Sequence, residues 1–391
     1  MHSFTYYTPT KVFFGKDALD RLTEAIAPYA PEKVMIVYGG GSVKRNGTLD
    51  KVEAALTGSH IDYLEYGGAK PNPTLDHAYE GVRLGKENHV DFILAIGGGS
   101  AIDTAKAIAH GVANPDLDIW DIWTGKSKLT QTLPLGCILT IPAAGSEMSN
   151  SAVLTNESIG SKRGLTSDLN RPKFAIMDPT LTFTLPKYQI ACGVTDIMMH
   201  TMDRYFNPLE NELSDSIAEA LLCTVIKYGR IGINEPDNYE AMSEIMWAGS
   251  LSHNDLTGLG GKKDFAPHQL GHELSARFDV AHGASLSTVW ASWARYVYEE
   301  KPSRFARFAR NVWGIVEADD NAAALDGIKK TEEYFHSLNM PTCFSEIIGV
   351  QEESVLEEMA VGCTRQGTRK IGSFMVLDYD DILAIYKEAD H

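Results

Sequence analysis

The sequence predicts two domains: an α/β domain with a Rossmann-like parallel sheet, and after it an all-helical domain. In the first half, short apolar runs that end in glycines alternate with helical stretches, which is the pattern of a parallel sheet covered on both faces. After about residue 186, strand-like runs become scarce and helical periodicity dominates. The length of 391 residues allows two or three domains of about 150 residues. We place the boundary at Leu185-Pro186, which gives domains 1–185 and 186–391.

The elements of the first domain follow from β-branched runs and from turn residues. Strands are expected at 33–38, 60–66, 91–96, 135–141 and 174–178. Helices are expected at 49–57, at 75–87 with Thr74 as N-cap, and from Ser100 onwards. The stretches 3–7 and 11–14 are expected to pair as a small hairpin.

The second domain is expected to consist of helices alone. Its helical segments are 187–206, 213–231, 238–254, 264–278, 286–299, 302–315, 321–338, 352–364 and 379–389.

Composition and charge restrict the possible partners. The chain has 35 Lys and Arg against 52 Asp and Glu, so its formal net charge is −17. Such an acidic chain is not expected to bind nucleic acid, because that binding depends on cations that neutralise phosphates. Docking on an anionic membrane is not expected either. A dinucleotide stays compatible with this charge, since backbone N–H groups can hold a pyrophosphate locally.

Cysteine use and the N-terminus predict a cytoplasmic protein. The five cysteines are odd in number and widely spaced, and no CxxC pair occurs, which favours reduced thiols. No signal peptide and no apolar run of about 20 residues is visible.

Two glycine turns each follow an expected strand and precede an expected helix. The first glycine turn comprises Gly39, Gly40, Gly41 and Ser42, and the second comprises Gly97, Gly98, Gly99 and Ser100. Glycines let the backbone approach a phosphate, and the helix start supplies N–H donors. Neither turn matches GxGxxG, so a tight turn that binds nothing remains an alternative for each. Two turns at one edge of a parallel sheet favour a dinucleotide.

The first glycine turn also predicts which dinucleotide is preferred. Lys44 and Arg45 follow it, and no acid stands in the turn to repel a 2′-phosphate. We therefore expect a preference for NADP(H), with NAD(H) as the alternative. Glu65, at the end of the second strand, argues for NAD(H) because it could accept a bond from a ribose 2′-OH.

Histidines and one aspartate show the spacing of metal ligands. Asp196 and His200 are four residues apart on one helix, and His268 and His272 repeat this spacing on a later one. His282 follows after an expected turn near 278–280. One carboxylate with three imidazoles suits a first-row divalent metal such as Fe or Zn. Histidines that only fill the core are the alternative.

The chain resembles the iron-containing alcohol dehydrogenase family, and within it the butanol dehydrogenase-like group. The resemblance covers essentially the whole chain and is most specific at 268–286, HQLGHELSARFDVAHGASL, with further matches at 39–47, 70–74, 95–109, 140–153, 175–186 and 193–205. It implies the architecture shared with dehydroquinate synthase: an α/β domain for the dinucleotide, a helical domain for the metal, and substrate in the cleft between them.

The resemblance also implies roles for particular residues. We call the implied metal ligands the metal-ligand cluster: Asp196, His200, His268 and His282. His272 matches a histidine near the metal that is not a ligand, and it is the candidate proton relay or a wall of the pocket. The second glycine turn matches the pyrophosphate site. The first matches the adenosine-ribose site, and related sequences that have the same GGGS residues there favour NADPH. Further positions near the cofactor are Asp103, Thr140, Ser146 and Lys162.

The sequence departs from the family pattern at three positions. Ala144 stands where relatives usually have Thr, Asp203 where they usually have Glu, and Gly271 where close relatives usually have Glu. None of these changes removes an implied ligand.

The expected function is hydride transfer between NADP(H) or NAD(H) and a primary alcohol such as butanol or its aldehyde. One divalent metal is implied, with Fe expected first and Zn next, and a homodimer is the default for such an enzyme. A polyol dehydrogenase of the glycerol or propanediol type is one alternative. A lyase of the dehydroquinate synthase type is disfavoured because the segments around the metal set are poor in Lys and Arg. A non-catalytic metal- or nucleotide-binding protein is the alternative of another class.

Overall fold

The computed structural model describes all residues from 1 to 391, and they form two compact units. The α/β unit comprises Tyr7–Leu185 and Pro236–Ser250. The helical unit comprises Met1–Tyr6, Pro186–Glu235 and Leu251–His391. The units divide at the expected boundary between 185 and 186, but Met1–Tyr6 groups with the helical unit and Pro236–Ser250 with the α/β unit.

Specific contacts explain where these two segments belong. In the segment 236–250, Trp247 packs edge-on against Phe14 of the α/β unit, and the Ser250 hydroxyl donates to the buried Glu147 carboxylate. At the N-terminus, the His2 N–H donates to Asn211 of the helical unit at 2.7 Å.

The α/β unit is built on a six-stranded sheet in which every neighbouring pair is parallel. The strand order is β1-β8-β5-β4-β2-β3. The strands are β1 (Lys11–Phe14), β2 (Lys33–Tyr38), β3 (Asp62–Tyr66), β4 (Phe92–Gly97), β5 (Leu135–Leu139) and β8 (Phe174–Met177). The predicted Rossmann-like parallel sheet is thus confirmed, and all strands end at the same edge.

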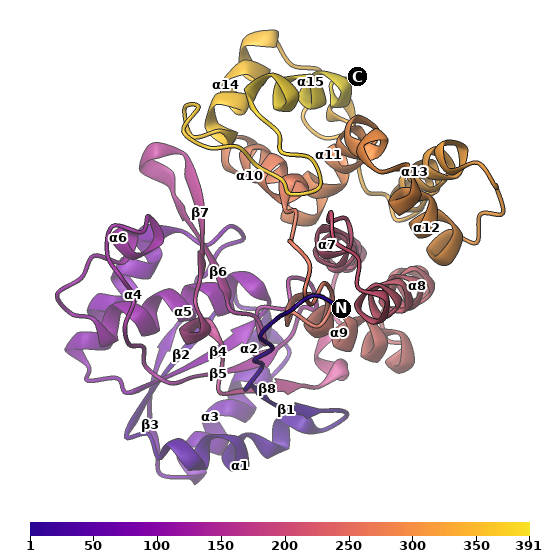
Figure 1. Cartoon of the computed structure of the whole chain (residues 1–391). Coiled ribbons are helices and arrows are strands. Elements are labelled where there is room, and N and C mark those ends of the chain that lie inside the picture. The colour runs from indigo at the N-terminus through magenta and orange to yellow at the C-terminus, as the bar shows by residue number, and fades with distance from the viewer. The chain divides into compact units, whose positions relative to one another are not determined.

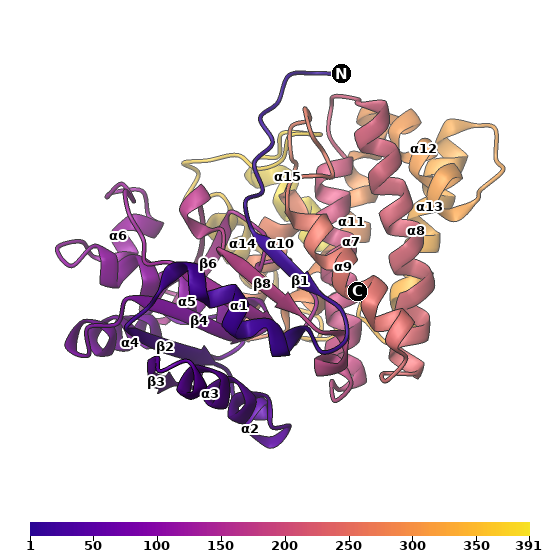
Figure 2. The ribbon, with the colours of Figure 1, turned by 90° about the horizontal axis from the view of Figure 1, so that it is seen from below.

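The predicted N-terminal hairpin is wrong. Residues 3–7 form no strand, and β1 lies beside β8 (Figure 2). The two strands pair in parallel, with Lys11 opposite Phe174. The β-forming residues of 11–14 were recognised, but their partner lies far along the chain.

Helices cover both faces of the sheet (Figure 1). On one face, α1 (Leu22–Ile26) and α3 (Thr48–Gly58) bury apolar side chains against β2 and β4. On the other face, α5 (Gly99–Ala113) buries Ile102, Ala105 and Ile108 against the same strands, and α4 (Leu75–Glu87) packs beside α5. The strands are apolar on both sides because both sides are covered.

Four further elements of this unit were not predicted. The short helix α2 (Ser42–Arg45) follows the first glycine turn, and α6 (Ile119–Trp123) begins at Asp118, which caps it. The strands β6 (Ser151–Asn156) and β7 (Ser161–Thr166) form an antiparallel hairpin. Ala152 and Leu154 of β6 are buried with apolar residues of α4, α5 and α6, so the hairpin is fixed beside the start of α5.

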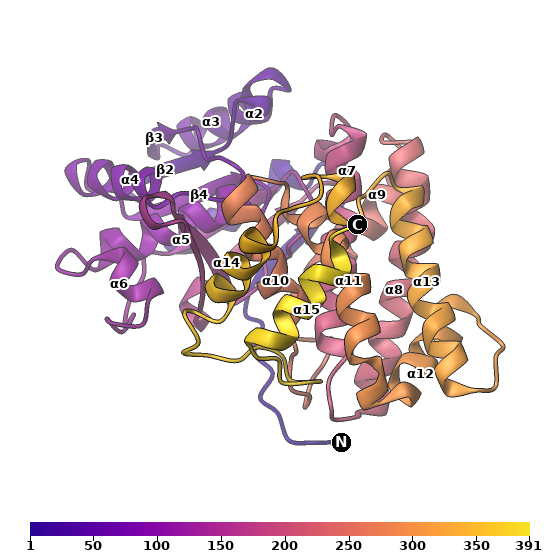
Figure 3. The ribbon, with the colours of Figure 1, turned by 90° about the horizontal axis from the view of Figure 1, so that it is seen from above.

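The helical unit contains eight long helices, and the described chain has no strand after β8. They are α7 (Lys187–Tyr205), α8 (Glu212–Asn234), α10 (Ala266–Phe278), α11 (His282–Val297), α12 (Pro302–Trp313), α13 (Asp320–Ser337), α14 (Glu353–Cys363) and α15 (Tyr379–Ala389). The remaining helix, α9 (Tyr239–His253), belongs mostly to the α/β unit. Figure 3 shows α12 beside α13 and α14 beside α15. Each of the nine predicted helical segments overlaps one of these nine helices, and the largest difference is that α11 begins at His282, four residues before the predicted start at 286.

Rings form the core of the helical unit. Phe206 stacks on Phe305 with ring centroids 4.2 Å apart, and Trp290, Trp293 and Phe308 surround it edge-on or tilted. The two tryptophans belong to α11, so this core holds the helix that begins with His282. None of the helices is both long and apolar enough to cross a bilayer.

His110, near the end of α5, is expected to make the protein less stable in acid. Its ring lies between the Thr132 hydroxyl at 2.8 Å and Asn170 Oδ1 at 2.7 Å, and burial lowers its pKa to about 4. A histidine in the unfolded chain has a pKa of about 6.5. Between this pH and the pKa of the folded state, the unfolded chain therefore binds more protons than the folded one. The free energy of unfolding should fall as the pH drops from 7 to 4, by about 3 kcal/mol from this group.

Urea unfolding at a series of pH values measures this effect. The variant His110→Gln should show a shallower pH dependence than the parent, whereas His89→Gln, at an exposed position, should not. An unchanged slope in His110→Gln would contradict the assignment.

Candidate functional site

The two glycine turns lie at the same edge of the parallel sheet. The first glycine turn joins β2 to α2, and the second joins β4 to α5. β2 and β4 are neighbours in parallel register, with Tyr38 opposite Ile96. Both turns therefore follow the carboxyl ends of adjacent strands, where open α/β sheets bind their ligands.

The second glycine turn fits the pyrophosphate of a dinucleotide. Gly98 is the N-cap of α5, a helix of 15 residues, and no side chain caps its first turn. A Cβ atom on Gly98 would lie 2.8 Å from Cβ of Ile141, so a larger residue would displace the turn. The first N–H groups of α5 and the positive end of its dipole are suited to bind an anion here.

Asp103 and Ser146 lie together beside this turn, joined by hydrogen bonds. The Ser146 hydroxyl donates to Asp103 Oδ1 at 2.6 Å, and the Val153 N–H donates to Asp103 Oδ2 at 2.8 Å. The buried Lys106 ammonium donates to the carbonyls of Ser146 and Ser151 and to the Ser146 hydroxyl. These bonds hold the loop before β6 against the first turns of α5.

Thr140 and Lys162 belong to the same neighbourhood. The Thr140 N–H donates to the Gly97 carbonyl at 3.0 Å. Lys162, on β7, donates from Nζ to Asn72 Oδ1 at 2.9 Å. Burial raises the pKa of the Asp103 carboxyl, and nearby ammonium groups, that of Lys162 among them, act against this rise. The predicted cofactor residues between 97 and 162 thus gather around the start of α5.

The first glycine turn has both a cation and an anion beside it. Lys44 Nζ lies 2.7 Å from Glu65 Oε2, and the Tyr38 hydroxyl donates to the same oxygen at 2.8 Å. The hydrogen bonds from Lys44 and Tyr38 lower the pKa of Glu65. The Arg45 guanidinium folds back towards Gly41, since its Nη1 lies 3.7 Å from where a Cβ on Gly41 would be.

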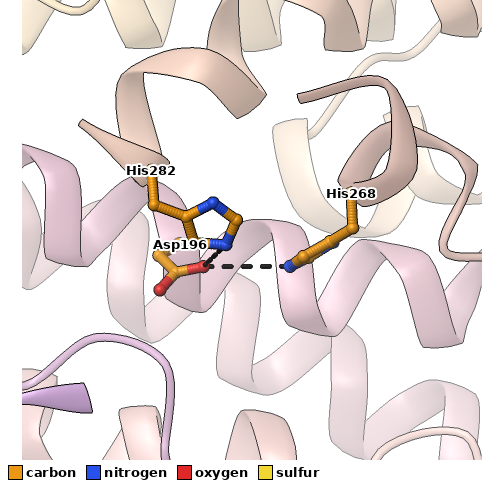
Figure 4. A group of neighbouring side chains, drawn as sticks. All are labelled: Asp196, His268 and His282. Carbon is orange, nitrogen blue, oxygen red and sulfur yellow. Dashed lines mark ion pairs between the residues drawn. The ribbon is translucent and has the colours of Figure 1, made fainter. Parts of the chain in front are cut away.

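The metal-ligand cluster comes together within the helical unit. Asp196 and His200 are on α7, His268 is on α10 and His282 is the first residue of α11. Asp196 Oδ1 lies 3.5 Å from Nε2 of His200, 3.9 Å from Nε2 of His268 and 3.6 Å from Nε2 of His282. Ligand atoms of Asp196, His268 and His282 all lie within 4.8 Å of one another (Figure 4).

The donors of this cluster fit a divalent transition metal. His268 Nε2 is buried and has no hydrogen-bond partner, whereas its Nδ1 is bonded to the Asp203 carboxylate. Burial, and after it the neighbouring imidazoles, lower the pKa of His200 well below its usual range, so this ring is neutral, as a ligand must be. One carboxylate oxygen and imidazole nitrogens are donors that Fe and Zn accept.

Close packing of the backbone places His282. Asp279 caps the end of α10 in the left-handed conformation, with φ of 51°. The chain therefore turns near 278–280, as predicted, and α11 begins at His282. A Cβ atom on Gly283 would lie 2.3 Å from the backbone oxygen of Cys192 on α7. Only glycine therefore lets the start of α11 touch α7, one turn before Asp196.

His272 lies beside the cluster and is not one of its converging groups. It follows His268 by one turn of α10, and its ring centroid lies 5.4 Å from that of His282 and 6.3 Å from that of His268. Its side chain is partly exposed.

The sequence reasoning did not identify the contacts that Lys106 and Asp203 make with predicted site residues. Lys106 is three residues after Asp103, and Asp203 is seven after Asp196, so helical periodicity places each on the same face as a predicted site residue. That spacing could have indicated that both residues face the predicted sites. It could not indicate which atoms Lys106 and Asp203 contact, because those atoms belong to distant segments of the chain.

Comparisons with known proteins agree along the whole chain. The family described as iron-containing alcohol dehydrogenase matches residues 9–179, and the C-terminal part of the Fe-containing alcohol dehydrogenase family matches residues 190–390. The NADH-dependent butanol dehydrogenase A of Clostridium acetobutylicum is 44% identical over 392 residues, which is 100% of each chain. The NADPH-dependent aldehyde reductase YqhD of Escherichia coli is 39% identical over 349 residues, covering 88% of this chain and 89% of that one.

A solved structure shows the same architecture. The crystal structure of NADH-dependent butanol dehydrogenase A from Thermotoga maritima matches with a TM-score of 0.96 and 34% identity, covering 100% of this chain and 99% of the other. Family models match both units, and full-length relatives are well above 30% identity. The chain therefore belongs to the iron-containing alcohol dehydrogenase family.

Proposed function

We propose that the protein interconverts primary alcohols, such as butanol, and their aldehydes with a nicotinamide dinucleotide and a divalent metal. The observation that carries this proposal is the convergence of buried Asp196 and His268 with the partly exposed His282, together with the unpartnered Nε2 of His268. Family membership supports the reaction class, and the names of relatives that act on butanol or aldehydes support the substrate class.

Each site residue has a part in this chemistry. When bound, the nicotinamide donates or accepts the hydride, and the metal polarises the carbonyl as a Lewis acid. The metal-ligand cluster would hold an ion through one carboxylate and three neutral imidazoles, with Fe expected first and Zn next. The second glycine turn would hold the pyrophosphate on the first N–H groups of α5.

His272 is the proposed proton relay. It lies at ring-contact distance from His282, and its partly exposed side chain can exchange a proton with water. An unperturbed imidazole titrates near neutral pH, which suits transfer of a proton to or from the alcohol oxygen.

Oxidation of reduced nicotinamide by aldehydes of two to six carbons tests the function. Metal-free protein is assayed anaerobically and aerobically with Fe²⁺, Zn²⁺, Mn²⁺, Co²⁺ or Ni²⁺, and glycerol and propanediols are offered in the reverse direction. We expect metal-dependent reduction of butanal. Activity on polyols alone would favour the polyol dehydrogenase, and no turnover with any combination would favour a non-catalytic binding protein.

For the cofactor, we propose that NADP(H) is preferred and NAD(H) is accepted. Lys44 compensates the charge of Glu65, and Arg45 adds a cation beside the first glycine turn. Relatives named after NADH and after NADPH both occur, so the proposal rests on these side chains.

Arg45→Ala is expected to lower kcat/KM with NADPH about tenfold, because a charge-assisted bond to the 2′-phosphate is lost at an exposed position. The value with NADH should change by less than about twofold, since NADH lacks this phosphate. Lys51→Ala, at an exposed position of α3, is the matched control. A wild-type kcat/KM that is higher with NADH would contradict the preference.

We also propose a cytoplasmic homodimer. All five cysteines are free thiols, which suits a reducing compartment. Sedimentation velocity measures the assembly directly, and a monomer at micromolar concentration would contradict it.

A further inference from the structure

Asp203 is a buried carboxylate that contacts a proposed metal ligand. It lies on α7 seven residues after Asp196 and is fully buried. Its Oδ2 accepts a hydrogen bond from Nδ1 of His268, on α10. Its other oxygen has no hydrogen-bond partner, so the carboxylate is directed at the imidazole.

This contact decides which nitrogen of His268 carries the hydrogen. A carboxylate only accepts, so Nδ1 must donate, and Nε2 keeps its lone pair. Nε2 is the atom that lies 3.9 Å from Asp196 Oδ1 and has no other partner. A ligating histidine whose second nitrogen donates to a carboxylate is held in orientation and made a stronger donor.

The backbone of Asp203 fixes the start of α10 as well. Its carbonyl accepts from the Asp264 N–H at 2.8 Å. The Asp264 carboxylate in turn accepts from the N–H groups of Ala266, Ser373 and Phe374 at 2.7–2.9 Å. His268 stands in the first turn of this anchored helix, so Asp203 constrains both the helix and the ring that it carries.

We propose that Asp203 is a positioning residue for the metal, which sets the tautomer and direction of the His268 ring so that Nε2 faces the metal-ligand cluster. This inference rests on the proposed function, because it requires that the cluster bind a metal.

The test uses the metal-free full-length protein and Co²⁺, whose visible absorption reports ligand geometry. Asp203→Asn is expected to weaken Co²⁺ binding about 10- to 100-fold and to change the absorption bands. Asp203→Glu keeps the carboxylate and should recover most of the affinity. Glu219→Gln removes another carboxylate of the same unit, which accepts from Tyr205 and Arg307, and should leave Co²⁺ affinity unchanged.

A second measurement needs no substitution. Nitrogen chemical shifts of His268 in the metal-free wild-type protein report its tautomer and should show hydrogen on Nδ1. Thermal unfolding of each metal-free variant separates weaker binding from a less stable fold.

The possible outcomes distinguish a failure of the role of Asp203 from a failure of the proposed metal site. Wild-type affinity and spectrum in Asp203→Asn, or hydrogen on Nε2 of His268 in the wild type, would overturn the role of Asp203 and leave the metal site standing. Failure of the wild-type protein to bind Co²⁺, Fe²⁺ or Zn²⁺ would overturn the metal site and this inference with it.

Discussion

Replacing His268 with alanine is expected to abolish turnover and metal binding while leaving dinucleotide affinity intact. The ring supplies a buried nitrogen without another partner, at the point where Asp196 and His282 converge. Loss of a Lewis acid that contributes several kcal/mol corresponds to a fall in kcat of about 10³-fold or more. The proposed dinucleotide residues all belong to the α/β unit, so NADPH should bind the variant as it binds the parent.

Metal analysis, steady-state kinetics and NADPH fluorescence titration measure the three effects separately. His272→Ala is the matched control for the metal, because it removes an imidazole one turn further along the same helix and should keep the ion bound. His336→Ala removes an exposed imidazole of the same unit and should change neither metal nor turnover. Retained metal with full activity in His268→Ala would refute the ligand set.

Periodicity within one segment predicted most helices well. The predicted segments 75–87 and 379–389 coincide with α4 and α15, because apolar positions at helical spacing give each one face to bury. The N-cap at Thr74 was placed correctly, yet its side chain makes no capping bond and the residue pairs with Thr155 instead. Local pattern thus located the helix start, while a distant strand decided what Thr74 contacts.

Strands were predictable where apolar, β-branched or aromatic residues run together. The runs before both glycine turns are buried on both faces and were recognised. The β7 sequence SKRGLT has two cations and a glycine, so nothing in its composition indicates a strand. The mistaken hairpin has a related cause: residues 11–14 form a strand, but the choice of partner depends on 174–177, which no local pattern specifies.

The candidate metal site was predictable in part from spacing. Asp196 and His200 share a helix face by their separation of four residues. His268 and His272 have the same separation, and only the fold places His268 nearer the convergence point. The contacts of Asp203 and Lys106 join elements far apart in sequence, so spacing indicated their helix face without indicating their partners.

Gly283→Ala is expected to damage the metal site through the backbone. The added Cβ would lie 2.3 Å from the Cys192 oxygen and 2.8 Å from its Cα, and these atoms belong to the rigid helix α7. The start of α11 must therefore move away from α7, and His282 moves with it. We expect a loss of about 2 kcal/mol in the free energy of unfolding, typical of overpacking. We also expect at least about tenfold weaker Co²⁺ binding, because coordination tolerates only small displacements.

Gly58→Ala makes the same chemical change at the end of α3, where an added Cβ meets nothing within 4 Å. It should be neutral or stabilising by up to about 1 kcal/mol, since alanine favours helices over glycine. Denaturant unfolding and Co²⁺ titration of the two variants give a paired comparison. Gly283→Ala with parental stability and affinity would mean that contact between α11 and α7 does not position His282, and the cluster would then depend on its side chains alone.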